Sequence, residues 1–199
     1  MDESPYIFNS DPTIDLMSVG LEDNTVLVID DALADAAPLL EAAREARFQP
    51  VHEGGNYYPG VRAPAPKEYA LALMDFLRPL IAAYLDIDTS TLTGARCALS
   101  LATRTPGELT IAQRLPHFDT TDPQQIAALH YLCAPHHGGT AFYRHRATGF
   151  ETITEIRSKP YFDRLRTEIR EHGEPASEYV TASGQFFQQT AAIDAAFNR

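Results

Sequence analysis

The C-terminal half of the chain limits the fold most strongly, because short apolar segments alternate there with turn residues. Gly and Pro separate four such segments after Leu92, at residues 95–102, 109–115, 127–133 and 139–143. Short strands at regular spacing are typical of a β-barrel or a β-sandwich. We therefore predict that residues 92–199 form a β-rich core.

Residues 1–91 have a different pattern. We expect an extended lead-in over residues 1–21, a strand at 25–29, a helix that ends near Phe48 and a second helix at 67–85. The stretch between the two helices is rich in Pro and Gly, and a loop of that length is often functional. A further helix is expected at 160–171. The whole chain is predicted to be one structural domain, with residues 1–91 packed on the core of residues 92–199.

Composition excludes several classes of function. The 199 residues include 27 Asp and Glu but only 16 Lys and Arg, so the formal net charge is −11 at pH 7. This balance disfavours nucleic acid and anionic membranes as partners. The sequence has no apolar stretch long enough to cross a bilayer, and its acidic N-terminus differs from a secretion signal. We therefore expect a cytoplasmic protein, in which Cys97 and Cys133 are buried free thiols.

The strongest candidates for chemistry are His117 and Asp119, in the motif QRLPHFD at residues 113–119. Residues two apart on a strand point to the same face, so this motif would offer an imidazole nitrogen and a carboxylate oxygen together. With a histidine from a distant strand, they would form the two-His-one-carboxylate triad that binds Fe(II). The alternative is a surface histidine beside a turn aspartate.

Basic residues follow on the expected strand at 139–143 and just beyond it. We expect Gly138 to begin the tight turn of a hairpin that joins this strand to residues 127–133. Arg144 and Arg146 would then share one face of the strand, where guanidinium groups can clamp a carboxylate. The alternative is that they pair with the protein's own carboxylates.

The other histidines have simpler interpretations. His130 lies in an apolar segment, which favours a buried histidine with satisfied hydrogen bonds over a metal ligand. His136 and His137 are expected at the tip of the hairpin, in solvent. His172 ends the last predicted helix, where a cation complements the helix dipole.

The loop at residues 57–62 is expected to pack over the mouth of the barrel. Arg62 would then point to the pocket or to an acidic partner within the domain. The alternative is an ordered, Pro-rich connector in which Arg62 is solvated.

Taken together, these motifs resemble a bacterial family of uncharacterised domains related to the prolyl-4-hydroxylase-like, 2-oxoglutarate- and Fe(II)-dependent oxygenases. The similarity spans most of the chain. It is carried by YPGVRAP at 58–64, QRLPHFD at 113–119, LHYLC at 129–133, GGTAFYRHRATGFE at 138–151 and FNR at 197–199.

The resemblance implies an α+β fold. Its core would be a double-stranded β-helix (a jelly-roll, cupin-like barrel), and an N-terminal strand and two helices would buttress one sheet. It also implies that His117 and Asp119 bind Fe(II), and that 2-oxoglutarate is the co-substrate. The candidate co-substrate-binding residues are Tyr131, Arg144 and Arg146.

A small-molecule, sugar or peptide substrate would then meet Tyr58, Arg62 and His145. In the look-alike family, a distal metal-binding histidine and a basic residue for 2-oxoglutarate follow the Phe-Asn-Arg segment. The sequence stops at Arg199, so we expect a fragment or a truncated product that lacks the last two barrel strands. His172 is not expected to replace the distal histidine, because it stands at a helix end.

Two other functions are left open by the sequence. One is a barrel that binds a ligand without redox chemistry, or a pseudoenzyme that has lost the third metal ligand. The other is Zn(II)-dependent hydrolysis or isomerisation in a cupin-like site.

Overall fold

The computed structural model describes residues 4–51, 57–85 and 87–199. Within these ranges the fold is mixed α/β, with three α-helices and three separate antiparallel sheets, none of which closes into a barrel. The helices are α1 (Ala37–Glu45), α2 (Lys67–Tyr84) and α3 (Glu155–His172). The sheets are β1 (Thr13–Val19) with β2 (Asn24–Asp30), β3 (Gln49–Pro50) with β4 (Gly60–Pro64) and β5 (Ala98–Ala102), and β6 (Gly139–His145) with β7 (Phe187–Asp194).

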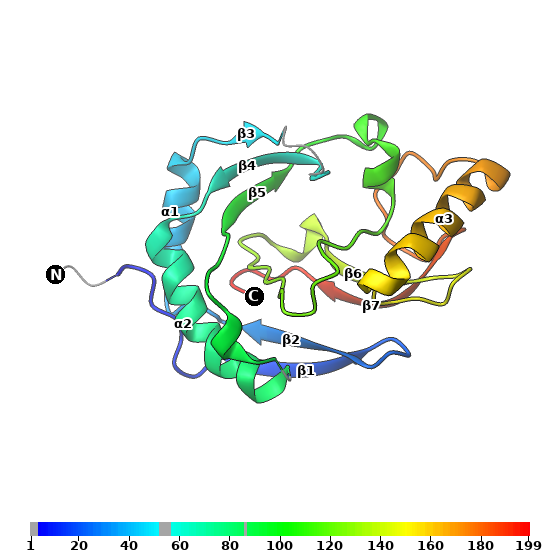
Figure 1. Cartoon of the computed structure of the whole chain (residues 1–199). Coiled ribbons are helices and arrows are strands. Elements are labelled where there is room, and N and C mark those ends of the chain that lie inside the picture. The colour runs from blue at the N-terminus through cyan, green and yellow to red at the C-terminus, as the bar shows by residue number, and fades with distance from the viewer. Residues whose placement is uncertain (1–3, 52–56, 86) are drawn as a thin grey trace.

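The three sheets surround the middle of the molecule (Figure 1). The three-stranded sheet lies at the top of the view, the β1–β2 hairpin at the bottom and the β6–β7 pair toward the right. Helices α1 and α2 cover the left side, α3 covers the right, and the chain ends near the centre. The centre is therefore where parts of the chain that share no sheet can meet.

The helices agree with the periodicity of the sequence. Helix α2 starts directly after Pro66, and α1 has Pro38 in its first turn, where a proline costs no hydrogen bond. The expected helix near the C-terminus is confirmed, although α3 begins five residues earlier than predicted, at Glu155. None of the helices in the described part of the chain has the length and hydrophobicity to span a lipid bilayer.

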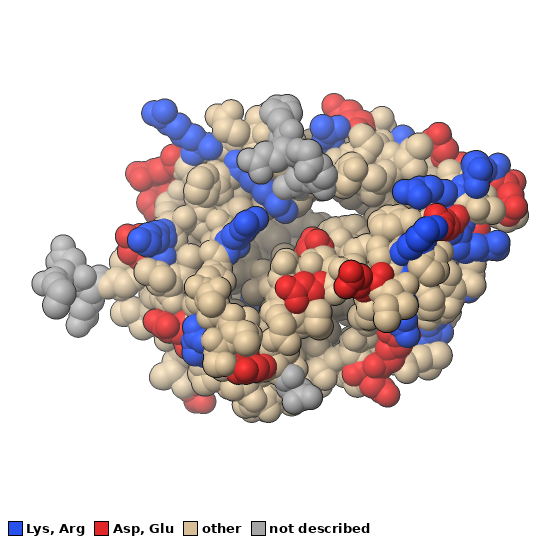
Figure 2. Space-filling view, viewed as in Figure 1, with Lys and Arg blue, Asp and Glu red and all other residues tan. Residues whose placement is uncertain are grey.

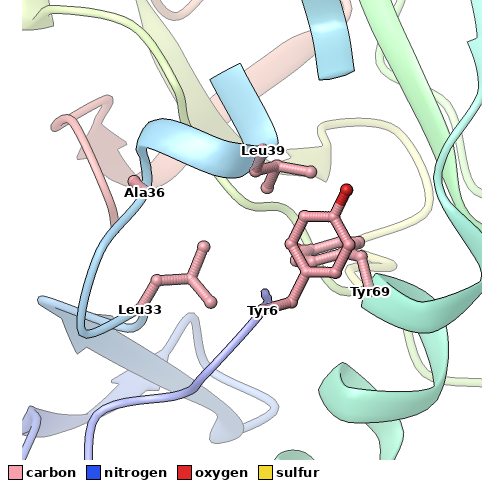
Figure 3. Close-up of a cluster of buried hydrophobic side chains, with 5 residues drawn as sticks. All are labelled: Tyr6, Leu33, Ala36, Leu39 and Tyr69. Carbon is pink, nitrogen blue, oxygen red and sulfur yellow. The ribbon is translucent and has the colours of Figure 1, made fainter. Parts of the chain in front are cut away.

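The first hydrophobic cluster joins the N-terminal segment to α1 and α2 (Figure 3). Tyr6 meets the ring of Tyr69 edge-on, with 5.7 Å between the ring centroids, and Leu39 packs beside them. Leu99 of β5 also packs against this cluster. Burial of these apolar side chains fixes α1 and α2 against the three-stranded sheet.

The lead-in expected over residues 1–21 contains a strand. β1 pairs with β2 from Thr13 opposite Asp30 to Val19 opposite Asn24. Asp15 and Ser18 made this segment look polar, but one face of a two-stranded hairpin can remain in solvent.

Two of the predicted strands are wrong. Residues 109–115 instead include the 3-10 helix Ile111–Arg114, which a capping box between Thr110 and Gln113 starts. Residues 127–133 form no strand either, because only Tyr131 pairs with another segment: its N–H donates to the Arg199 carbonyl and its carbonyl accepts from the Asn198 N–H.

The hairpin expected between residues 127–133 and 139–143 is also wrong. The strand at 139–143 exists as β6, but its partner is β7, with Gly139 opposite Asp194. A 3-10 turn at Pro135–His137 precedes β6, and Gly138 follows it with a positive φ of 108°. The two glycines therefore end a turn, and β6 pairs with a strand about 50 residues later in the chain.

The β1–β2 hairpin is joined to the rest of the fold through Asn198. Its side-chain oxygen accepts a hydrogen bond from the Leu33 N–H (3.0 Å), and its side-chain nitrogen donates to the Leu33 carbonyl (2.9 Å). Its backbone carbonyl accepts from the N–H of Ala32 and its N–H donates to Tyr131. Asn198 has a φ of 65°, a left-handed conformation that Asn tolerates better than most residues.

We expect Asn198→Ala to lower the free energy of unfolding by about 2–4 kcal/mol, because the Leu33 N–H and carbonyl would be buried without partners. Urea denaturation measures this loss. The control is Asn9→Ala, which removes a hydrogen bond to the Asp11 N–H at an exposed turn and should cost less than about 1 kcal/mol. Equal losses in the two variants would contradict the role of Asn198.

Candidate functional site

His117 and Asp119 lie in a turn region between η3 (Ile111–Arg114) and residue 125, so the strand expected here is wrong. Both side chains are exposed, at 82% and 62%, and His117 Nε2 lies 3.7 Å from Asp119 Oδ1. Between them, Phe118 packs edge-on against Tyr161 of α3, with ring centroids 6.0 Å apart. Phe118 therefore anchors the segment and leaves the imidazole and the carboxylate together in solvent.

Two pockets lie on either side of this pair. One, of about 280 Å³, is lined by Asp119 itself, by further polar residues of two loops (Thr120, Thr121, Asp122, Gln125, Thr152 and Thr154) and by the apolar Pro123, Ala127 and Ile153. The other, of about 260 Å³, lies between residues 114–116 and the loop at 175–187. Asp119 of the candidate pair therefore lines a small pocket of mixed polar and apolar character.

The pair supplies two of the donors that a metal ion needs. Two donors about 2.1 Å from a metal ion and at right angles lie about 3 Å apart, so a small rotation of either side chain would bring Nε2 and Oδ1 onto one ion. Within residues 4–51, 57–85 and 87–199, no group of three His, Cys, Asp or Glu is placed to hold a metal. The fit to a facial triad is therefore two ligands of three.

Arg144 pairs with one of the protein's own carboxylates, which is the alternative to carboxylate binding that the sequence left open. Its Nε and Nη2 lie 2.7 and 2.6 Å from Glu151 Oε1. The Glu151 carboxylate also accepts hydrogen bonds from the backbone N–H groups of Leu21 and Glu22. Burial raises the pKa of Glu151, but these backbone donors and Arg144 together lower it below its ordinary value.

This ion pair holds the turn between β1 and β2. At Gly20, φ is +77° and an added Cβ would lie 2.0 Å from Glu151 Oε2. Only glycine allows the turn to approach the carboxylate so closely. Arg144 therefore stabilises the fold, and its guanidinium is already occupied.

The side chains of Arg146 and Tyr131 also form hydrogen bonds with other groups of the protein. Arg146 is exposed, and its Nε donates to the carbonyl of Gly184, which lines the pocket beside residues 114–116. The Tyr131 hydroxyl makes a short hydrogen bond with Thr140 on β6. Of these two candidates for co-substrate binding, only Arg146 is close to a pocket.

His145 is the most deeply buried of the candidate residues, with 1% of its side chain exposed. Its Nε2–H donates to Glu168 Oε2 of α3 (2.8 Å), and its Nδ1 accepts from the Thr148 hydroxyl (2.9 Å). Burial lowers the pKa of His145, although the Glu168 carboxylate opposes that effect. Both ring nitrogens have protein partners, so His145 links β6 to α3 rather than facing a pocket.

Tyr58 lies just before β4 of the three-stranded sheet, and Arg62 lies within that strand. The Pro-rich connector expected at residues 57–62 is in part the strand β4, so Arg62 is not simply solvated. The Arg62 guanidinium lies 4.3 Å from the centroid of the Tyr58 ring. Residues 52–56, in the Pro- and Gly-rich stretch between the two helices, lie outside the described residues.

The interpretations of His130 and of the cysteines agree with the structure. The Nδ1 of His130 accepts from the Tyr69 hydroxyl and its Nε2–H donates to Asn198 Oδ1, so the ring is satisfied. Burial lowers the pKa of His130, and the bond to Asn198 opposes this. Cys97 and Cys133 are free and partly buried.

Reasoning from the sequence missed the partners that occupy these side chains. Glu151 and Glu168 carry no local motif that distinguishes them from surface acids. Asn198 lies in the FNR segment, whose importance the resemblance did indicate, but its contacts with Leu33 join residues 165 positions apart. Such long-range pairs have no signal in one sequence.

We expect the protein to lose stability as the pH falls below about 6.5. Burial lowers the pKa of His130 and His145 in the folded chain, whereas both rings take up a proton near pH 6.5 once the chain unfolds. Each ring can therefore lower the free energy of unfolding by up to about 1.4 kcal/mol for each pH unit below 6.5. Urea denaturation at pH 7.5 and 5.5 measures the loss.

The exposed His136 provides the control for this pH dependence. His136→Gln should keep the full loss of stability between pH 7.5 and 5.5, because this side chain is exposed and its replacement leaves both buried rings in place. A free energy of unfolding that is constant over this range, or that rises as the pH falls, would contradict the burial of the two neutral rings.

Comparison with known proteins places the chain in a family. Residues 10–199 match the model of a family of unknown function, DUF6445. No curated protein matches the chain, and no solved structure does. Since the family model covers nearly the whole sequence, the chain belongs to the DUF6445 family.

Proposed function

We propose that this protein is an Fe(II)- and 2-oxoglutarate-dependent oxygenase that uses His117 and Asp119 as metal ligands. The observation that carries the proposal is the pairing of His117 Nε2 with Asp119 Oδ1 at 3.7 Å, in solvent, beside a pocket that Asp119 lines. An imidazole and a carboxylate are two of the three ligands in the triad of such enzymes. The motifs that resemble the prolyl-4-hydroxylase-like oxygenases also support it.

The proposed architecture is an open form of the double-stranded β-helix. Three antiparallel sheets around a common middle, with α1 and α2 on one side, are the parts that such a barrel contains (Figure 1). The exposed pair lies on the segment between β5 and β6. A barrel that closes around this segment would surround the metal ligands with strands.

Each residue of the proposed site has a defined task. His117 and Asp119 would hold the metal, while Phe118 fixes their backbone against α3. The bound Fe(II) and 2-oxoglutarate would together supply the oxidation of a C–H bond by O₂. The hydroxyl group of Thr120 in the adjoining pocket, which accepts from the Asp122 N–H and can still donate, would orient a substrate by a hydrogen bond.

The second candidate is a protein that binds a ligand without redox chemistry. It is favoured by the engagement of Arg144 with Glu151, which takes one of the expected carboxylate clamps out of use. A pocket without a co-substrate clamp can still bind a ligand.

The test is calorimetric titration of Fe(II) into the anaerobic protein, followed by measurement of 2-oxoglutarate consumption. We expect Fe(II) to bind and 2-oxoglutarate to be converted slowly to succinate. His117→Ala and Asp119→Ala should each weaken Fe(II) binding by about tenfold or more, because each removes one ligand. His136→Ala, which removes another exposed imidazole, should leave it unchanged.

These variants separate the two functions. If His117→Ala binds Fe(II) as tightly as the original chain, the proposed metal site is wrong. If Fe(II) binds at His117 and Asp119 but 2-oxoglutarate is never consumed, the oxygenase is wrong and the non-redox function takes its place.

A further inference from the structure

Arg62 lies in the middle of the three-stranded sheet. It is opposite Gln49 of β3 on one side and opposite Ser100 of β5 on the other. The next residue, Ala63, is buried, and its partner Leu99 packs against the cluster around α1 and α2. Because side chains alternate along a strand, Arg62 and Ser100 lie on the opposite face of the sheet.

Among the described residues, the guanidinium of Arg62 has an aromatic neighbour but no acidic partner. It lies over the ring of Tyr58 in cation–π geometry, 4.3 Å from the ring centroid. Its Nε is buried without a hydrogen-bond partner, and no carboxylate in the described part of the chain forms an ion pair with this side chain. Buried polar nitrogens nearly always have a partner, so the unpaired Nε marks a guanidinium whose hydrogen-bonding capacity the described residues do not use in full.

The unpaired state of Arg62 is unusual for this chain. Acidic residues outnumber basic ones by 27 to 16, so most arginines can find a carboxylate. Four partly buried arginines do so, in the pairs Arg114–Glu174, Arg144–Glu151, Arg157–Glu22 and Arg199–Asp30. On the face of Arg62, the neighbours across the sheet are the uncharged Gln49 and Ser100. Among the described residues, the position therefore keeps a positive charge that no carboxylate neutralises.

The surroundings of Arg62 match a planar carboxylate. A guanidinium binds a carboxylate with two parallel hydrogen bonds, and the Tyr58 ring holds its plane in place. Burial raises the pKa of Tyr58, so its hydroxyl stays protonated. Arg62 offers one positive charge, and the chain as a whole has a net charge of −11 and therefore repels anions. This site thus suits a monovalent carboxylate better than a divalent phosphate.

Figure 2 shows how charged side chains are distributed on one face of the molecule. This face of the molecule is hollowed in its middle, with basic side chains on the side of α2 and the three-stranded sheet. Acidic side chains lie across the hollow from them. An anion would therefore be drawn to the side of the sheet.

We propose that Arg62, stacked on Tyr58, binds a carboxylate group of the substrate, so that the protein acts on an organic acid. The assignment to a substrate rests on the proposed oxygenase function, whereas the binding of a carboxylate to Arg62 does not. A residue in this role fixes the orientation of the substrate and takes no part in the oxidation itself.

The test is an NMR titration of the metal-free protein with propionate, which follows the Nε–Hε signal of Arg62. Propionamide, an uncharged molecule of the same shape, is the matched probe. We expect a saturable shift of the Arg62 signal with propionate and none with propionamide. Equal responses to both probes, or no response to propionate, would overturn the proposal.

Three variants complete this titration. Arg62→Gln should weaken propionate binding by about tenfold or more, and Arg62→Lys should retain part of it, because Lys keeps the charge but not the two parallel donors. Arg47→Gln removes the same charge from an exposed side chain and should have no effect. Unchanged binding in both Arg62 variants would show that the carboxylate binds elsewhere.

A second titration distinguishes the source of the carboxylate. The protein is loaded with Zn(II), a diamagnetic substitute for Fe(II), and with 2-oxoglutarate before propionate is added. Continued binding of propionate to Arg62 supports a substrate carboxylate, whereas its displacement by 2-oxoglutarate would overturn that assignment. If Zn(II) and 2-oxoglutarate do not bind, the proposed oxygenase fails, while the metal-free titration still decides whether Arg62 binds a carboxylate.

Discussion

Three parts of the chain that share no sheet meet at the side chain of Asn198. Its amide both accepts from and donates to the backbone of Leu33, and its oxygen also accepts from the ring of His130. The next residue, Arg199, forms a bidentate ion pair with Asp30 at the end of β2. The three sheets of the described residues are not joined to one another by backbone hydrogen bonds between strands. These side-chain contacts therefore connect them.

Charge pairing completes this assembly at the other end of the hairpin. The turn after β1 is held by Glu151, and Glu22 in the same turn pairs with Arg157 of α3 at 2.6 Å. An acidic protein has few cations, and the half-buried ones are used where two separate segments must be joined. Arg62 differs from these paired arginines, because no carboxylate in the described part of the chain forms an ion pair with it and its Nε has no hydrogen-bond partner.

The sequence predicted the elements whose signal is local. Helix α2 and the strands β2 and β6 follow from apolar spacing, and these predictions are confirmed. The segment at 109–115 has the composition of a strand, but the capping-box spacing from Thr110 to Gln113 already indicated a helical turn. The partner of β6 could not be predicted, because β7 lies about 50 residues further along and shares no turn with it.

The candidate site was predicted in part for the same reason. His117 and Asp119 do lie together, but not because they alternate on a strand. Phe118 between them is buried against Tyr161, and that tertiary contact turns its two neighbours outward. Arg144 and His145, by contrast, bind Glu151 and Glu168, acids whose positions only the folded chain reveals.

We propose that His117 and Asp119 share one metal ion beside the pocket that Asp119 lines. Crystals soaked in Mn(II), which has the same preference for imidazole and carboxylate ligands and scatters anomalously, test it most directly. A metal site at this pair predicts an anomalous peak within about 2.3 Å of both His117 Nε2 and Asp119 Oδ1. Mn(II) bound only at other residues, or absent from this pair at saturating concentration, would contradict it.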